Sequence, residues 1–250
     1  MAARLMTITY RALLREARAL TRSNRALHFL DTPSLETIVK SYGRGSFVPA
    51  PNPRAVQEAL FPGVDFAGFP TSEMTGEEVG ALVRASFRRG PSGSGSEAGL
   101  RHLAALNTLR ALAPCSSVAT TEVGEVVRVR TELTTLFLPS LALGAMEESG
   151  RFTYAYRVRV HNTGLVPIQI LGRHWLFSSS RGDLMEVPRG SPGVVGHSPR
   201  LDPGMTFQYV SGVSLATPQG SMEGSFQAIA HDGKVHFDAT VARAELRAPQ

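Results

Sequence analysis

Hydrophobic and polar positions follow a helical period near the start of the chain. When successive residues are placed about 100° apart, the arginines of residues 4–22 fall in one stripe and apolar side chains fall on the opposite face. That apolar face holds Met6, Tyr10, Leu13, Ala17 and Leu20. Residues 75–89 and 97–113 carry two more amphipathic stretches, so the pattern predicts three helices within the first 115 residues.

The segments between these helices are rich in helix-breaking residues. Six prolines divide residues 31–75 into short pieces, of which 35–42 and 53–60 suit one or two helical turns each. We interpret residues 31–75 as an irregular insertion in the helical domain. Thr75-Gly-Glu-Glu78 supplies an N-cap with acidic first-turn residues for the second helix, and residues 90–96 form a flexible hinge before the third.

From residue 118 onward, apolar and polar residues alternate. Val127, Val129 and Leu133 alternate with charged side chains, as a half-buried strand requires, and residues 152–160 repeat the pattern. Further short strands are predicted at 166–171, 174–178, 205–213, 222–229 and 235–247. Many short strands separated by turn residues predict an antiparallel sandwich. The predicted fold class is therefore α+β, with two domains at 1–115 and 116–250, divided where Pro114 ends the last helix.

The net charge is unevenly distributed between these halves. Residues 1–115 hold 14 basic and 9 acidic side chains, whereas residues 116–250 hold 12 of each, so the formal charge of +5 belongs to the helical half. An arginine face of this kind favours an acidic partner, although a solvated surface is the simpler alternative. The chain has no apolar run of about 20 residues that would span a membrane, and its single Cys115 excludes an internal disulfide.

Two segments of the helical half resemble the LYR-motif family of mitochondrial proteins. They read Tyr10-Arg-Ala-Leu-Leu-Arg-Glu-Ala-Arg18 and Val83-Arg-Ala-Ser-Phe-Arg88. Thr9 stands where the motif has Leu, and Leu20 stands where Phe is usual. The resemblance implies a three-helix bundle that captures mitochondrial acyl carrier protein. By this match the binding residues are Tyr10, Arg11, Arg15, Arg18, Arg84, Phe87 and Arg88.

The same resemblance implies the cofactor and the compartment. The chain would hold no cofactor itself, because the 4′-phosphopantetheine and its acyl chain are carried by the partner. Arginine suits the acidic surface and the phosphate of that partner by forming bidentate contacts. The arginine-rich, acid-poor start is typical of mitochondrial targeting segments, so we expect the mitochondrial matrix. Ordinary core packing is the alternative reading of Tyr10 and Phe87.

The second half resembles the ApaG family over residues 126–247. The resemblance is carried by Tyr154-Ala-Tyr-Arg157, His161-Asn162, Gly172-Arg-His-Trp175, Gly193-Val-Val-Gly196, Pro203-Gly204 and Gly220-Ser-Met-Glu-Gly224. It implies an immunoglobulin-like or fibronectin-like sandwich, with a glycine loop associated with phosphate or pyrophosphate. Here the loop glycines are Gly190, Gly193 and Gly196, an altered spacing that turn geometry alone can explain, so we expect no nucleotide binding.

No catalytic constellation emerges from the sequence. The histidines lack metal-ligand spacing, and residues 178–183 read as a turn rather than a nucleophile elbow. We therefore expect a non-catalytic mitochondrial adaptor that binds acylated carrier protein and docks on the ribosome, its assembly intermediate or a respiratory complex. The alternative is an RNA-contacting ribosomal or RNA-processing protein whose arginine face contacts phosphates, rRNA included. A phosphoanhydride enzyme is the third hypothesis.

Overall fold

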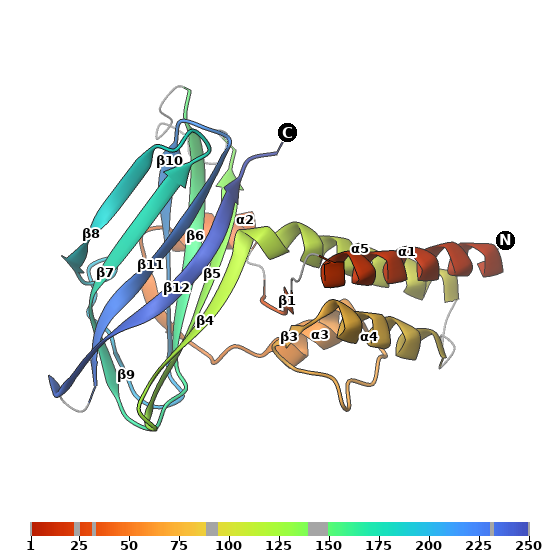
Figure 1. Ribbon diagram of the computed structural model, residues 1–250, viewed down its shortest axis with the longest axis horizontal. Helices are drawn as coiled ribbons and strands as arrows, with labels where there is room; N and C mark the ends of the chain where they lie inside the picture. The colour runs from red at the N-terminus through yellow and green to blue at the C-terminus, as the bar shows by residue number, and fades with distance from the viewer. Residues whose placement is uncertain are drawn as a thin grey trace. The chain divides into compact units, whose positions relative to one another are not determined.

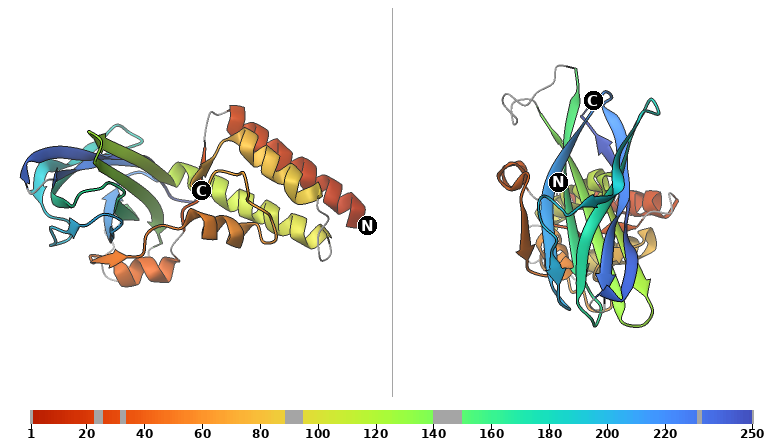
Figure 2. Two further views of the ribbon diagram at one scale, coloured as in Figure 1. Left: turned by 90° about the horizontal axis from the view of Figure 1, so that it is seen from below. Right: turned by 90° about the vertical axis from the view of Figure 1, so that its left-hand side faces the viewer.

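The computed structural model describes residues 2–22, 26–31, 34–88, 95–139, 150–230 and 233–249. Contacts divide the chain into two compact units (Figures 1 and 2). The helical unit comprises Met1–Asp31 and Asn52–Ala113, and the β unit comprises Thr32–Pro51 and Pro114–Gln250. The chain therefore passes from one unit to the other three times.

The helical unit is built from three long helices and a short one, and it also contains two short strands. The long helices are α1 (Ala2–Arg22), α4 (Gly76–Arg88) and α5 (Gly95–Leu112), and the short helix is α3 (Pro53–Leu60). Strands β1 (Leu27–His28) and β3 (Glu73–Met74) pair antiparallel. The prediction of a three-helix domain is thus not confirmed. Among the described residues the unit holds four α-helices, because Asn52 caps an additional turn inside the proline-rich stretch.

The buried stripe of α1 explains why the three long helices meet. Thr9, Leu13, Ala17 and Leu20 are buried, with Tyr10 only half-buried beside them. A Cβ on Gly99 of α5 would lie 3.3 Å from Thr9 and 3.5 Å from the Phe87 ring of α4. The small Thr9 therefore occupies a position where α5 approaches α1 closely, which leaves little room for the leucine of the LYR motif.

The start of α4 confirms the predicted N-cap. The Thr75 backbone N–H donates to Glu78 Oε2 at 2.7 Å, and the Glu78 N–H donates to Thr75 Oγ1 at 3.3 Å. This reciprocal pair is a capping box, which satisfies two backbone donors of the first turn. Helix α5 begins at Gly95, inside the predicted hinge. A short 3-10 turn η1 (Ala113–Cys115), with Pro114 as its middle residue, follows the end of α5.

The β unit is a sandwich of two antiparallel sheets, as predicted. One sheet has the order β2-β10-β6-β5-β4 and the other has the order β12-β11-β7-β8, with β9 paired to β7. The strands are β2 (Gly45–Val48), β4 (Ser116–Val123), β5 (Val127–Leu138), β6 (Phe152–Asn162), β7 (Ile168–Ser179), β8 (Leu184–Pro192), β9 (Arg200–Leu201), β10 (Thr206–Leu215), β11 (Gln219–Ala230) and β12 (Val235–Arg247). Fully buried Trp175, Tyr154, Phe226 and Leu133 lie in the core between the sheets.

Two differences from the expected strands bear on function. The predicted pieces 166–171 and 174–178 form the single strand β7, and β8 was not expected at all. Strand β8 includes Gly190, so the predicted glycine loop begins inside a strand rather than forming one continuous turn. Because proline is depleted in strands, Pro188 and Pro192 lower the strand propensity of this segment, and the sequence therefore does not predict β8.

Residues 34–48 belong to the β unit, which differs from the expectation that residues 31–75 are an insertion in the helical domain. Helix α2 (Leu35–Ser41) buries Ile38 against Leu138, Ala155 and Val210. Strand β2 pairs with β10, so that Phe47 lies opposite Phe207 with ring centroids 5.5 Å apart. This segment therefore completes one edge of the first sheet.

Candidate functional site

The arginine face of α1 has the geometry that the sequence predicts. Arg11, Arg15 and Arg18 are all exposed and lie opposite the buried Leu13 and Ala17. Within the described ranges, none of these three guanidinium groups forms an ion pair with a carboxylate. The face is therefore available to an acidic partner.

Tyr10 and Phe87 are brought together by the packing of α1 on α4. Their ring centroids lie 5.1 Å apart with planes inclined by 54°, and both side chains are half-buried. This tilted pair of rings contributes to the packing of α1 on α4, and each ring is also partly exposed to solvent. Arg84 is exposed on α4; Arg88 ends that helix, and its side chain lies outside the described residues.

A hollow of 610 Å³ lies between α1 and α4, and we call it the α1–α4 hollow. Its arginines are Arg18, Arg22 and Arg84, so two of the predicted site residues meet here while Arg11 and Arg15 do not take part. Leu14, Ala17, Thr21, Gly76, Glu77 and Gly80 complete its lining. Arg22 belongs to the basic stripe predicted from the sequence but not to the predicted site, because only the crossing of the two helices creates the hollow.

The glycine loop does not present a free row of backbone donors. The Gly190 N–H donates to Gln227 Oε1 at 3.2 Å, and the Gly193 N–H donates to the Leu171 carbonyl at 2.9 Å. Val194 and His197 donate to each other's carbonyl oxygens across a tight turn that contains Gly196. Because these N–H groups have acceptors within the chain, the loop is poorly suited to cradle a phosphate.

Arg173 of β7 anchors this loop. Its Nη1 donates to the carbonyl oxygens of Pro192 at 3.1 Å and Gly193 at 2.6 Å. Arg173 thus links β7 to the end of β8, beside the buried Trp175. The tight turn that follows holds Val195 at φ +43°, a left-handed conformation that is strained for a β-branched residue.

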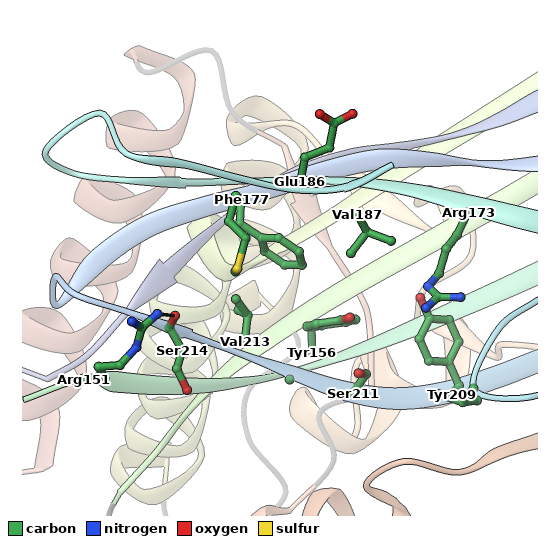
Figure 3. Close-up of a pocket in the computed structure, with 13 residues that line it drawn as sticks. Arg151, Tyr156, Arg173, Phe177, Glu186, Val187, Tyr209, Ser211, Val213 and Ser214 are labelled. Carbon is green, nitrogen blue, oxygen red and sulfur yellow. Dashed lines mark hydrogen bonds between the residues drawn. The ribbon is translucent and has the colours of Figure 1, made fainter. Parts of the chain in front are cut away.

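A cleft of 550 Å³ opens between the two sheets next to this loop, and we call it the inter-sheet cleft (Figure 3). Tyr156, Tyr209 and Ser211 line it from one sheet, and Arg173, Phe177 and Val187 line it from the other. The remaining lining residues are Arg151, Met185, Glu186, Val195, Gly212, Val213 and Ser214. The sequence did not reveal the cleft, because its lining comes from strands that are far apart along the chain.

The phenol groups of this cleft stay protonated at physiological pH. Burial raises the pKa of the Tyr156 hydroxyl, an effect that a hydrogen bond with Ser211 and the charge of Arg173 partly offset. Burial also raises the pKa of the Tyr209 hydroxyl well above its ordinary value. Both groups therefore remain hydrogen-bond donors. On the outer side of the same strands, His174 Nε2 lies 2.9 Å from Glu186 Oε1 at the rim of the cleft.

Other site types find little support in the described part of the chain. There, no three His, Cys, Asp or Glu side chains are grouped so as to hold a metal ion. The thiol of Cys115 is partly buried, and burial raises its pKa, which disfavours the reactive thiolate. None of the described helices combines the length and the apolar composition needed to cross a membrane.

Comparisons with known proteins identify relatives of the β unit. The ApaG domain family matches residues 144–230. Protein ApaG of Nitrosospira multiformis is 39% identical over 127 residues, which cover 51% of this chain and 95% of the relative. Protein ApaG of Chromobacterium violaceum is 44% identical over 99 residues, covering 40% and 76%. A solved structure of the ApaA protein from Bordetella pertussis is 31% identical, covers 50% and 98%, and has a TM-score of 0.45.

Proposed function

Because this chain belongs to the ApaG family through its C-terminal half, we propose that it is a two-part adaptor whose β unit binds a protein partner. In this proposal the helical unit captures acylated acyl carrier protein in the mitochondrial matrix. The β unit docks on a larger assembly, either the mitochondrial ribosome or its assembly intermediate, or a respiratory complex. The adaptor carries out no reaction of its own, and the acyl-phosphopantetheine group belongs to the carrier.

The arginine face of α1 is the observation that carries this proposal. Arg11, Arg15 and Arg18 are exposed on a helix whose opposite side is buried, and none of them forms an ion pair with a carboxylate of the described residues. An acidic carrier surface complements such a face, and this complementarity mainly speeds association and selects the partner. Binding through this exposed face of α1 needs no catalytic group.

The α1–α4 hollow supplies a second point of contact. Arg18 and Arg84 line it together with Leu14 and Ala17, so cationic and apolar groups are adjacent. A phosphodiester bound at the arginines would direct an attached acyl chain toward the apolar part of the lining. Arginine is suited to this task because its planar group contacts two phosphate oxygens at once.

Affinity capture tests the proposal directly. The triple variant Arg11→Glu, Arg15→Glu, Arg18→Glu should lose acyl carrier protein, because charge reversal repels an acidic partner. The matched control reverses three exposed arginines of the β unit, Arg44, Arg181 and Arg243, and should retain capture. Both variants change net charge equally, so a purely global electrostatic effect would affect them alike.

The identity of the captured molecule separates this function from the alternative. The chain is purified from its native host, and the intact mass of co-migrating species is measured. A small acidic protein that carries pantetheine and an acyl chain supports the adaptor. Bound RNA fragments without carrier protein would instead favour an RNA-contacting role, and capture by the triple variant at the wild-type level would refute the role of the arginine face.

A further inference from the structure

The inter-sheet cleft contains a buried donor for which the described residues offer no acceptor. Tyr209 is 2% exposed, and its hydroxyl oxygen has no hydrogen-bond partner among the residues that the structure describes. The indole N–H of Trp175 lies close enough to lower the pKa of this hydroxyl, but the two groups do not meet the geometry of a hydrogen bond. Since an indole N–H can only donate, it cannot accept the Tyr209 proton in any arrangement. A buried donor of this kind calls for an acceptor, which the described part of the chain does not supply.

Arg173 places a fixed positive charge beside that donor. Its hydrogen bonds to the carbonyl oxygens of Pro192 and Gly193 both use Nη1, and they hold the guanidinium group in position. Figure 3 shows the end of the Arg173 side chain next to the Tyr209 ring, with Tyr156 and Ser211 facing the same space. Three kinds of donor therefore converge on one region of the cleft, and the arginine is held in place before any ligand arrives.

One wall of the cleft is formed by apolar side chains. Phe177 and Val187 of one sheet lie opposite Val213 of the other. Met185 also lines the cleft. A pocket that combines an apolar wall with a few convergent polar groups is the usual form of a small-ligand site. The strained backbone at Val195, which also lines the cleft, is a further feature that clusters at binding sites.

We infer that the inter-sheet cleft binds a carboxylate carried on an apolar stem. The carboxylate accepts hydrogen bonds from the Tyr209 hydroxyl and the Arg173 guanidinium, and the stem lies against Phe177 and Val213. A single negative charge matches the single arginine at this end of the cleft, whereas a dianionic phosphate would retain an unpaired charge. Glu186 at the rim repels a dianion more strongly than a singly charged carboxylate.

The edge of the second sheet is poorly suited to pairing with an added strand, so we expect the ligand to enter the cleft as a side group. Strand β8 lies at the end of this sheet, but its pairing with β7 shifts between Arg173 and Trp175. Pro188 falls within the resulting bulge, and Pro192 ends the strand. Bulges and prolines are the devices by which sheet edges avoid pairing with another chain.

Two sources can supply this chemistry, namely a free organic acid and the carboxylate of a protein partner. The inference goes beyond the adaptor role and does not depend on the partner of the helical unit. Trp175 provides the readout, because it is the only tryptophan in the chain and lies beside Tyr209. Titration of the full chain with 3-phenylpropionate should change tryptophan fluorescence saturably, and 3-phenylpropionamide should bind at least about tenfold more weakly.

The variant Tyr209→Phe is the decisive test, because it removes the unsatisfied hydroxyl and keeps the ring. Affinity for the carboxylate probe should fall about tenfold, while the ligand-free protein should melt at the same or a higher temperature. The matched control is Tyr154→Phe, which removes a buried hydroxyl that donates to the Thr217 carbonyl at 3.5 Å. That control should lower the melting temperature and leave affinity unchanged.

A second probe distinguishes the two sources. A short acetylated peptide that ends in phenylalanine is tested with a free C-terminal carboxylate and with a C-terminal amide. Tighter binding of the carboxylate peptide than of 3-phenylpropionate assigns the site to a protein partner, and the reverse order assigns it to a free acid. The inference is overturned if the acid and amide forms bind equally, if neither acid binds up to its solubility limit, or if Tyr209→Phe retains full affinity.

Discussion

Two glycines of α4, four residues apart, should respond in opposite ways to the same substitution. A Cβ at Gly76 would lie 2.3 Å from Thr21 Oγ1 and 2.4 Å from both the Ala17 carbonyl oxygen and the Thr21 nitrogen. Two of these atoms belong to the backbone of α1, so Gly76→Ala must push the helices apart. At Gly80 the nearest atoms are Arg84 Nη1 at 3.4 Å and Ala17 Cβ at 3.7 Å, which is ordinary contact.

The expected free energies follow from these distances. Overpacking against a fixed backbone costs about 1–3 kcal/mol, so we expect Gly76→Ala to lower the free energy of unfolding of the helical unit by about 2 kcal/mol. Gly80→Ala replaces a mid-helix glycine without a clash and should raise it by about 0.5–1 kcal/mol, since alanine loses less backbone entropy. The two variants should therefore melt on opposite sides of the wild type, with a shift of about 4–8 °C per kcal/mol.

Circular dichroism at 222 nm follows the helices, and fluorescence of Trp175 follows the β unit. Thermal or urea melts of the full chain should show the opposite shifts in the helical signal and little change in the tryptophan signal. Equal effects of the two substitutions, or a stabilised Gly76→Ala variant, would refute the close approach of α1 and α4. A control at Gly182, in an exposed turn at φ +90°, should destabilise through backbone strain and affect the tryptophan signal instead.

Three further outcomes are expected. Calorimetry with ATP or pyrophosphate should detect no binding to the β unit, because Gly190 and Gly193 already donate within the chain; micromolar affinity lost on Gly193→Val would contradict this. The fragment 116–250 lacks β2 and α2, so it should self-associate through the free edge of β10. Sedimentation should show that adding peptide 34–48 restores the monomer. A fragment that stays monomeric without the peptide would contradict this expectation. Burial raises the pKa of Tyr154 to about 12, which favours its neutral form in the fold. The contribution of this group to stability should therefore be fully present below the ordinary value near 10 and be lost between pH 10 and 12, so that stability falls less steeply for Tyr154→Phe in denaturant titrations over that range.

Local patterns were sufficient for the helices and for most strands. The stripe of arginines opposite Leu13 and Ala17, and the pairing of Thr75 with Glu78, depend on neighbours within one or two helical turns. Alternation over residues 127–133 likewise reflects a strand with one buried face. These features need no knowledge of tertiary contacts, which is why periodicity alone predicted them.

The features that escaped prediction depend on distant partners. Residues 45–48 have no strand signature of their own, and they become a strand only because β10 offers an edge. The inter-sheet cleft joins Arg173 to Tyr209 across two sheets, and the α1–α4 hollow joins Arg22 to Arg84 across two helices. Tertiary packing decides such pairings, so neither the residues nor their spacing could reveal them.

The threefold passage of the chain between its two units has a consequence for its synthesis. Residues 34–48 leave the ribosome before the second part of the helical unit, yet the strand that receives β2 is made only after β4–β9. During translation, Ile38 therefore remains exposed while the rest of the helical unit and most of the β unit are synthesised. The nascent chain consequently carries an unpaired strand and an uncovered isoleucine for most of its elongation. That interval is when a chaperone would protect it, and when misassembly with a neighbouring nascent chain would begin.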